Sequence, residues 1–230
     1  MMDNYFFVEG DNGRIQIDDN FKNLSLVKKV TIPANINWTE FNDRYYSDNA
    51  LVAFRPSFQN GDSDPSSDNG YYAPEYRISN GILRINNYLW GAPPPMDFYI
   101  FDAADPPLEP DAGLAIFNAQ GEPVYSTNNS YLRVVELRSD TLGYSIPATI
   151  PNPITAPVLV GEYSSKVAVA VVGEAHSASW APGDRWDFHQ VIKFIGNKIY
   201  AKYLFEESNS SAGSGSYEQN NFSLMIIKVD

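Results

Sequence analysis

Residues 76–85 read YRISNGILRI, with an Asn-Gly pair between two short runs that are rich in isoleucine. Asn and Gly both adopt positive φ at low cost, so this pair is a strong local signal for a tight β-hairpin turn. Residues 193–201, KFIGNKIYA, repeat the pattern with Gly-Asn at the turn, and residues 5–18 contain a third example around Asn12-Gly13. These three stretches predict antiparallel hairpins.

The composition around these turns is that of a β protein. The 230 residues include 15 Tyr, 13 Phe, 16 Pro and 15 Gly, and the apolar runs between turn signals are short. Aromatic residues favour strands, Pro and Gly end them, and almost no stretch shows the period of an amphipathic helix. We therefore expect an all-β chain.

Similar sequence motifs recur along the chain at a long period. Gly13 and Gly121 each end a hairpin motif, and their offset (121 − 13 = 108) also relates Leu24 to Leu132. The later hairpins and the strands that close each half keep the same order, with a growing offset that loop insertions explain. The pattern predicts an internal duplication.

The duplication predicts two tandem antiparallel β-sandwich-like domains, each with its own interior. Residues 1–104 form the first copy and residues 113–230 form the second. Residues 105–112 are acidic and rich in Pro, which cannot donate to a β ladder, so we expect an extended linker there. Residues 60–70 and 207–216 lack core-forming side chains and are expected to be mobile surface loops.

Charge and composition narrow the functional classes. The chain has a formal net charge of −12, no Cys, and no cluster of Lys and Arg. Duplex nucleic-acid binding draws most of its affinity from basic side chains on phosphates, so we expect no nucleic-acid partner. No apolar run approaches the roughly 20 residues that a membrane-spanning helix needs. The first residues lack the basic start of a signal peptide, which predicts intracellular synthesis.

Residues 113–126, GLAIFNAQGEPVYS, carry a resemblance to a known family. The pattern Gly-Leu-x-Ile-Phe-Asn-x-x-Gly-x-x-x-Tyr-Ser, followed by a polar spacer and the strand-like residues 131–135, resembles small structural proteins of tailed bacteriophages that are associated with the tail tip or tail fibre. Residues 10–18 look like a diverged copy of the same hairpin, although one copy is usual in that family.

The resemblance implies a virion structural protein, made in the host cytoplasm, whose partners are other virion proteins. Contact with a host-surface glycan and formation of a homo-oligomer are further expectations. A capsid decoration protein is an alternative that differs in its location in the particle. The resemblance transfers no catalytic residue and no cofactor.

Aromatic side chains are the candidate recognition surface, because Trp and Tyr give large contact area at low entropic cost. In the pairs Tyr45-Tyr46 and Tyr71-Tyr72 the two side chains point to opposite faces of a strand, so one of each pair is expected to be exposed. The candidates are Trp38, Tyr45, Tyr46, Tyr71, Tyr72, Trp180 and Trp186.

Catalytic triads and metal sites find less support. The two histidines, His176 and His189, have no Gly-x-Ser-x-Gly motif beside them, so no Ser-His-acid triad is expected. Asp62, Asp64 and Asp68 loosely resemble a calcium-binding loop, but a solvated loop explains them more simply. We expect no metal and no cofactor.

A protein that acts on or binds glycans is the alternative from another functional class. Trp180 and Trp186 have Asp184 and Asp187 as near neighbours, and glycoside hydrolysis uses two carboxylates beside aromatic platforms. A β protein this rich in aromatic residues shows such neighbours by chance. The sequence therefore predicts a non-enzymatic protein.

Overall fold

The computed structural model describes residues 7–9, 15–18, 24–33, 38–57, 63–89, 95–103, 114–118, 120–121, 123–127, 130–145, 154–208 and 214–229. All regular structure in these residues is β, with no helix, so the all-β prediction is confirmed. The strands are β1 (Phe7–Glu9), β2 (Ile15–Asp18), β3 (Leu24–Ile32), β4 (Thr39–Phe41), β5 (Leu51–Pro56), β6 (Tyr72–Ser79), β7 (Ile82–Leu89), β8 (Met96–Ala103), β9 (Ala115–Phe117), β10 (Pro123–Ser126), β11 (Arg133–Thr141), β12 (Tyr144–Ser145), β13 (Ile154–Thr155), β14 (Val158–Glu162), β15 (Val167–Gly173), β16 (His176–Ala181), β17 (Asp184–Ile195), β18 (Lys198–Ser208), β19 (Gly215–Gln219) and β20 (Asn221–Lys228).

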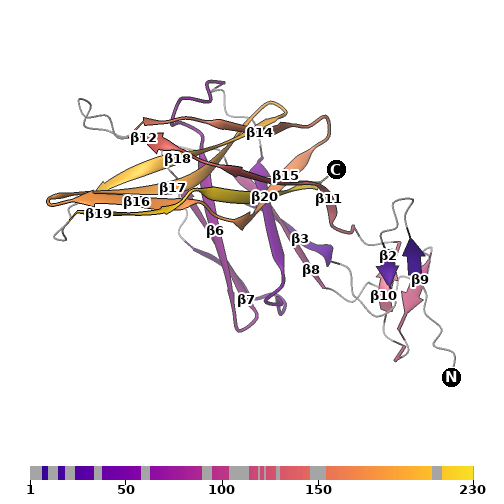
Figure 1. Cartoon of the computed structure of the whole chain (residues 1–230). Helices are drawn as coiled ribbons and strands as arrows, with labels where there is room; N and C mark the ends of the chain where they lie inside the picture. Colours follow the sequence, from indigo (N-terminus) through magenta and orange to yellow (C-terminus); the bar gives the residue numbers. More distant parts are fainter. Residues whose placement is uncertain are drawn as a thin grey trace.

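Most of the strands belong to two antiparallel sheets (Figure 1). The six-stranded sheet has the order β11-β20-β15-β5-β8-β3. The larger sheet has the order β14-β18-β17-β6-β7-β4, and β16 pairs with both β17 and β19. Strands β2, β9 and β10 lie apart from both sheets, near the N-terminus (Figure 1).

Both sheets continue from the first half of the chain into the second. In the six-stranded sheet β5 pairs with β15 at Phe54 and Val169, and in the larger sheet β6 pairs with β17 at Tyr72 and Ile192. We call these two junctions the seam. Outward from the seam, β5-β8-β3 corresponds to β15-β20-β11, and β6-β7-β4 corresponds to β17-β18-β14. An internal duplication predicts this order, and the duplication itself remains a prediction.

The predicted hairpins form where the turn residues allow them. Asn80 and Gly81 have φ of 52° and 75°, which suits the two central positions of the turn between β6 and β7. Gly196 has a φ of 62° at the first central position of the turn between β17 and β18. Strands β1 and β2 also pair, although the predicted turn residues between them lie outside the described residues.

One apolar core lies between the two sheets and draws on both halves of the chain. Its buried members include Val52, Phe54, Tyr72, Leu83, Met96, Phe98, Val167, Val169, Phe188, Ile192, Tyr203, Phe222 and Leu224. The expectation of two separate interiors is therefore wrong. Strands of the two halves hydrogen-bond across the seam, so each sheet is continuous and both pack on the same interior. The expected linker, residues 105–112, lies outside the described residues and remains a prediction.

The outer edges of the six-stranded sheet meet at one end. The amide of Leu26 donates to the Ser130 carbonyl at 2.7 Å, and the amide of Leu132 donates to the Leu24 carbonyl at 2.9 Å. These bonds join the start of β3 to the residues just before β11, and they close the sheet around a second, smaller cluster that includes Tyr99. Leu24 and Leu132, which the sequence repeat equates, thus lie opposite each other.

Candidate ligand-binding pocket

A cavity of about 690 Å³ opens at the seam of the larger sheet. Strands β6 and β17 pair at Tyr72 and Ile192. The cavity lies next to this pair, between the residues that follow Tyr72 on β6 and those that precede Ile192 on β17. The C-terminal part of β15, on the opposite sheet, forms its floor together with Phe54. We call this cavity the seam pocket. Its volume is in the range of small-molecule sites in proteins.

Aromatic side chains line the seam pocket. Trp38, just before β4, lines it together with Tyr72 and Tyr76 of β6. The guanidinium carbon of Arg77 lies 3.9 Å from the centre of the Trp38 ring, which is a close cation–π contact. This contact fixes the indole beside the cavity and places a charged donor next to an apolar surface.

Three acidic side chains also line the seam pocket. Glu75 of β6, Glu174 between β15 and β16, and Glu206 of β18 all line it. The Glu174 residue is exposed, but the surrounding pocket partly desolvates its carboxyl, and this desolvation together with the negative charge of Glu75 raises the carboxyl pKa. Among the described residues, none of the three carboxylates forms an ion pair. The pocket therefore concentrates negative charge that no Lys or Arg of the described part of the chain neutralises in an ion pair.

Two buried polar groups at the seam pocket lack hydrogen-bond partners. Gln190, which is 4% exposed, accepts a hydrogen bond from the Ala175 amide at 2.8 Å through Oε1. Its Nε2 has no acceptor in the described part of the chain, and the same holds for the hydroxyl of Tyr72. Burial also raises the pKa of the Tyr72 hydroxyl. An unsatisfied buried donor costs free energy, and both atoms are closed to solvent, so a ligand that supplies an acceptor satisfies them only after these side chains turn towards the cavity.

The two histidines meet across a strand pair beside the pocket. His176 of β16 lies directly opposite His189 of β17, and their rings are stacked with centres 5.2 Å apart. His189 lines the pocket. Ser177, the neighbouring residue on β16, is buried and its hydroxyl donates to the Asn220 side chain at 2.8 Å. Because adjacent residues of a strand point to opposite faces, Ser177 lies on the other face of β16 from His176.

The structure brings two of the seven predicted aromatic residues to the pocket, namely Trp38 and Tyr72. Tyr45 is 72% exposed, while Tyr46 is buried and its hydroxyl donates to Asp43 at 3.0 Å. The expectation that one tyrosine of each pair is exposed holds for this pair. It is wrong for Tyr71 and Tyr72, which are both buried.

Trp180 and Trp186 pack within the larger sheet and do not line the seam pocket. The ring of Trp180 lies over Gly215, its cross-strand neighbour on β19, where a Cβ would overlap the indole. Trp186 is half-buried against the main core. The carboxylate of Asp187 accepts hydrogen bonds from Arg185 at 2.7 and 2.8 Å. These contacts give the region from Trp180 to Asp187 a structural role.

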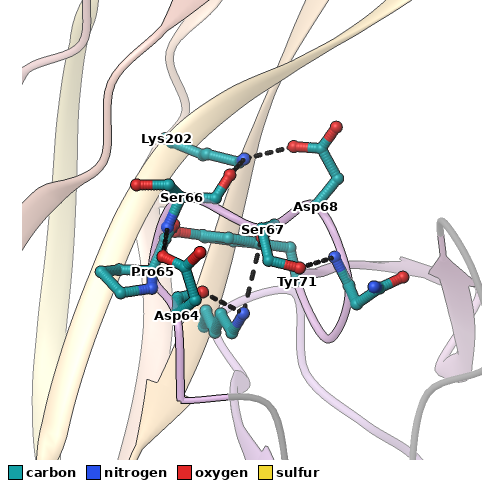
Figure 2. A network of polar contacts seen from close by, with 9 residues as sticks. Asp64, Pro65, Ser66, Ser67, Asp68, Tyr71 and Lys202 are labelled. Carbon is teal, nitrogen blue, oxygen red and sulfur yellow. Dashed lines mark hydrogen bonds and ion pairs between the residues drawn. The ribbon is translucent and has the colours of Figure 1, made fainter.

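Tyr71 belongs to a polar network that joins the two halves (Figure 2). Lys193 of β17 and Lys202 of β18 are buried, and their ammonium groups lie 5.3 and 4.7 Å from the centre of the Tyr71 ring. The Tyr71 hydroxyl donates to the Pro65 carbonyl at 2.7 Å. We call this arrangement, with residues 64–68, the lysine clamp.

Residues 64–68 supply the oxygens of the lysine clamp (Figure 2). Lys193 donates to the Asp64 carbonyl at 2.7 Å, and Lys202 donates to the Ser66 carbonyl at 3.3 Å and to the Asp68 carboxylate. The expected solvated loop is thus fastened to the second half from residue 64 onward. Of the carboxylates considered for calcium, that of Asp68 pairs with Lys202 and that of Asp64 accepts a hydrogen bond from the Ser66 amide at 2.8 Å; Asp62 lies outside the described residues. No group of three or more metal-ligating side chains occurs among the residues that were searched, which are the described ones.

Sequence reasoning missed Glu75, Glu174 and Gln190 as pocket residues. The chain contains a local signal only for the pairing of β16 with β17 beside the pocket. Pro182 and Gly183 form the turn between β16 and β17, and Gly183 has a φ of 99°. A two-residue turn at this position sets the opposition of His176 and His189. The pairing of β6 with β17 across the seam has no comparable local signal in the sequence.

Comparisons with protein-family models, with curated protein sequences and with solved structures find no match to this chain. In the part of the chain that the structure describes, no helix has the length and apolar character needed to cross a membrane.

Proposed function

We propose that the protein is a non-enzymatic structural component of a tailed bacteriophage virion, at the tail tip or tail fibre, that contacts a host-surface glycan through the seam pocket. The hairpin motif of residues 113–126 supports the virion part of this proposal. The seam pocket supports the glycan part, and it is the single observation on which recognition depends. Assembly involves other virion proteins, and self-association is part of the same proposal.

The chemistry of the seam pocket suits a saccharide. Sugar rings present apolar C–H faces that pack on aromatic side chains, and Trp38 and Tyr76 provide such surfaces. Sugar hydroxyls both donate and accept, and they match a set that combines Glu75 and Glu174 as acceptors with Gln190 Nε2 as a donor.

A glycan array with the purified chain tests the recognition proposal, followed by titration calorimetry on each glycan that binds. We expect Trp38→Ala to weaken binding about tenfold, because an aromatic contact in such a site contributes about 1.5 kcal/mol. Tyr45→Ala is the matched control, since Tyr45 is exposed but does not line the seam pocket. Equal losses for the two variants, or an array without any binding, would contradict the proposal.

Labelling of intact particles tests the virion proposal separately. An antibody against the chain, viewed by electron microscopy, is expected to mark the tail tip or the tail fibre. Label on the capsid shell would favour the decoration-protein alternative. Particles without label would contradict both locations.

A second candidate function, glycoside hydrolysis, draws on a different feature of the same pocket. Glycosidases pair a carboxylic acid of raised pKa with a second carboxylate. Glu174, whose carboxyl pKa is raised by desolvation and by the charge of Glu75, has the first property, and Glu75 supplies the second group. Release of reducing ends from array-positive glycans, lost in both Glu174→Gln and Glu75→Gln, would establish this activity. Binding without turnover would establish recognition alone.

A further inference from the structure

We propose that the seam pocket selects a saccharide that carries a free amino group, so that an ammonium ion of the ligand lies between Glu75 and Glu174. This inference rests on the proposed glycan recognition and names the class of glycan.

The charge balance of the seam pocket points to a cationic ligand. Three carboxylates line it, from Glu75, Glu174 and Glu206, whereas Arg77 is the one Lys or Arg side chain among its described lining residues. Arg77 already contacts the Trp38 ring. A pocket of this sign disfavours acidic sugars, because their carboxylates would face like charges in a partly desolvated site.

The two central carboxylates act on each other across the seam. Glu75 lies on β6 of the first half, and Glu174 follows β15 of the second half. The charge of Glu75 contributes to the raised pKa of Glu174, which places the two carboxylates within direct electrostatic reach. One ammonium group between them relieves their repulsion and forms charge-assisted hydrogen bonds to both.

The buried neutral groups exclude a ligand that is only a cation. Gln190 Nε2 can only donate, and it has no acceptor among the described residues. A protonated polyamine carries donors alone and leaves this group unsatisfied. A saccharide offers hydroxyl and ring oxygens as acceptors, and its hydroxyls also match the free hydroxyl of Tyr72. An amino sugar is the class that meets both requirements.

Titration calorimetry with a matched pair of probes tests the inference. The first probe is the tetramer of β-1,4-linked glucosamine, and the second is its N-acetylated counterpart, which has the same rings and linkage but no charge. At pH 6 and 150 mM salt we expect the glucosamine tetramer to bind at least about tenfold more tightly. Spermidine, a cation without acceptors, is expected to bind more weakly than the glucosamine tetramer.

Three variants locate the effect. Glu75→Gln and Glu174→Gln each remove one negative charge from the seam pocket, so each is expected to weaken binding of the glucosamine tetramer severalfold more than binding of the N-acetylated tetramer. Glu162→Gln, at an exposed position of β14 outside the pocket, is the control. Tyr72→Phe removes only a hydroxyl that has no hydrogen-bond partner among the described residues, so we expect the fold to be retained and binding of both tetramers to weaken about fivefold.

The possible outcomes separate this inference from the function on which it rests. Equal or tighter binding of the N-acetylated tetramer overturns the inference and leaves glycan recognition standing. Spermidine binding as tight as the glucosamine tetramer, and unaffected by Tyr72→Phe, overturns it in favour of a simple cation site. Absence of binding by either tetramer, together with an empty glycan array, overturns both proposals.

Discussion

Asp68→Ala is predicted to lower the stability of the whole fold, because it leaves a buried lysine without its anion. The Lys202 side chain is 2% exposed, and its ammonium group is held by the Asp68 carboxylate, the Ser66 carbonyl at 3.3 Å and the Tyr71 ring. After the substitution only the carbonyl and the ring remain within the described network. The free energy of unfolding is expected to fall.

The size of this destabilisation depends on how deeply Lys202 and Asp68 are each buried. Removal of one member of a fully buried ion pair costs about 3–5 kcal/mol. Asp68 is 71% exposed, so water reaches part of the site and the loss moves towards that of a hydrogen bond to a charged group, about 1.5–3 kcal/mol. We therefore expect a destabilisation of about 1.5–3 kcal/mol, measured by urea unfolding followed by tryptophan fluorescence.

Two further variants make the measurement specific to the lysine clamp. Glu40→Ala removes the Glu40–Arg84 pair, whose charged atoms lie 2.8 Å apart at the surface, and is expected to cost less than about 1 kcal/mol. Asp68→Ala combined with Lys202→Met is expected to be more stable than Asp68→Ala alone, since the double variant no longer buries the Lys202 charge without its anion. If Asp68→Ala and Glu40→Ala have equal effects, or if the double variant is the less stable, the reasoning fails.

Three other predictions address the carboxylates, the turns and the loop. The raised pKa of Glu174 means that the folded protein binds this proton more tightly than the unfolded chain, so its ionisation costs stability as the pH rises above about 4.5. Glu174→Gln is therefore expected to be more stable than the wild type at pH 7 and equally stable at pH 4. The gain at pH 7 is expected to be less than about 1 kcal/mol, because Glu174 is exposed and lies near His176 and His189 as well as Glu75. A gain that is larger at pH 4 than at pH 7 would contradict this sign. Gly81 and Gly196 both have positive φ, so Gly81→Ala and Gly196→Ala are each expected to lose about 1–2 kcal/mol of stability. The Cβ of Gly81→Ala would also overlap the Tyr45 ring, whereas that of Gly196→Ala meets no atom within 4 Å, so Gly81→Ala is expected to be the less stable in urea. Millimolar Ca²⁺ is expected to leave the melting temperature unchanged, because Lys202 already pairs with the Asp68 carboxylate and Lys193 already binds the Asp64 carbonyl, and a rise that EDTA reverses would argue for a metal site.

The parts of the fold that were predictable are those set by local turn chemistry. Asn80-Gly81 and Gly196-Asn197 place positive φ where a two-residue hairpin needs it, and both hairpins form. Leu24 and Leu132, related by the sequence repeat, lie opposite each other in the structure. A turn acts over a few residues, so its sequence carries the information needed to predict it.

The joining of the halves was not predictable in the same way. Phe54 meets Val169, and Tyr72 meets Ile192, across 115 and 120 residues of chain (169 − 54 and 192 − 72). The continuous apolar runs of β5 and β15 fit two separate sandwiches as well as one shared core. The choice depends on which strand edges pair, and that is a tertiary property.

The candidate site follows from this pairing. Glu75 and Glu174 belong to different halves, and only the seam brings them to one cavity. The lysine clamp has the same origin, since Asp68 and Lys202 come from opposite halves. The sequence showed Asp68 as an acidic loop residue, but its buried partner became visible only with the tertiary structure.

Chemical-shift mapping of the ¹⁵N-labelled chain during titration with the glucosamine tetramer tests the central proposal most directly. Recognition at the seam pocket predicts shifts of the amides of Glu75 and Arg77 on β6 together with those of His189 and Gln190 on β17, so that both halves respond to one ligand with one dissociation constant. Shifts confined to a single half, or centred on Trp180 and Trp186, would contradict it.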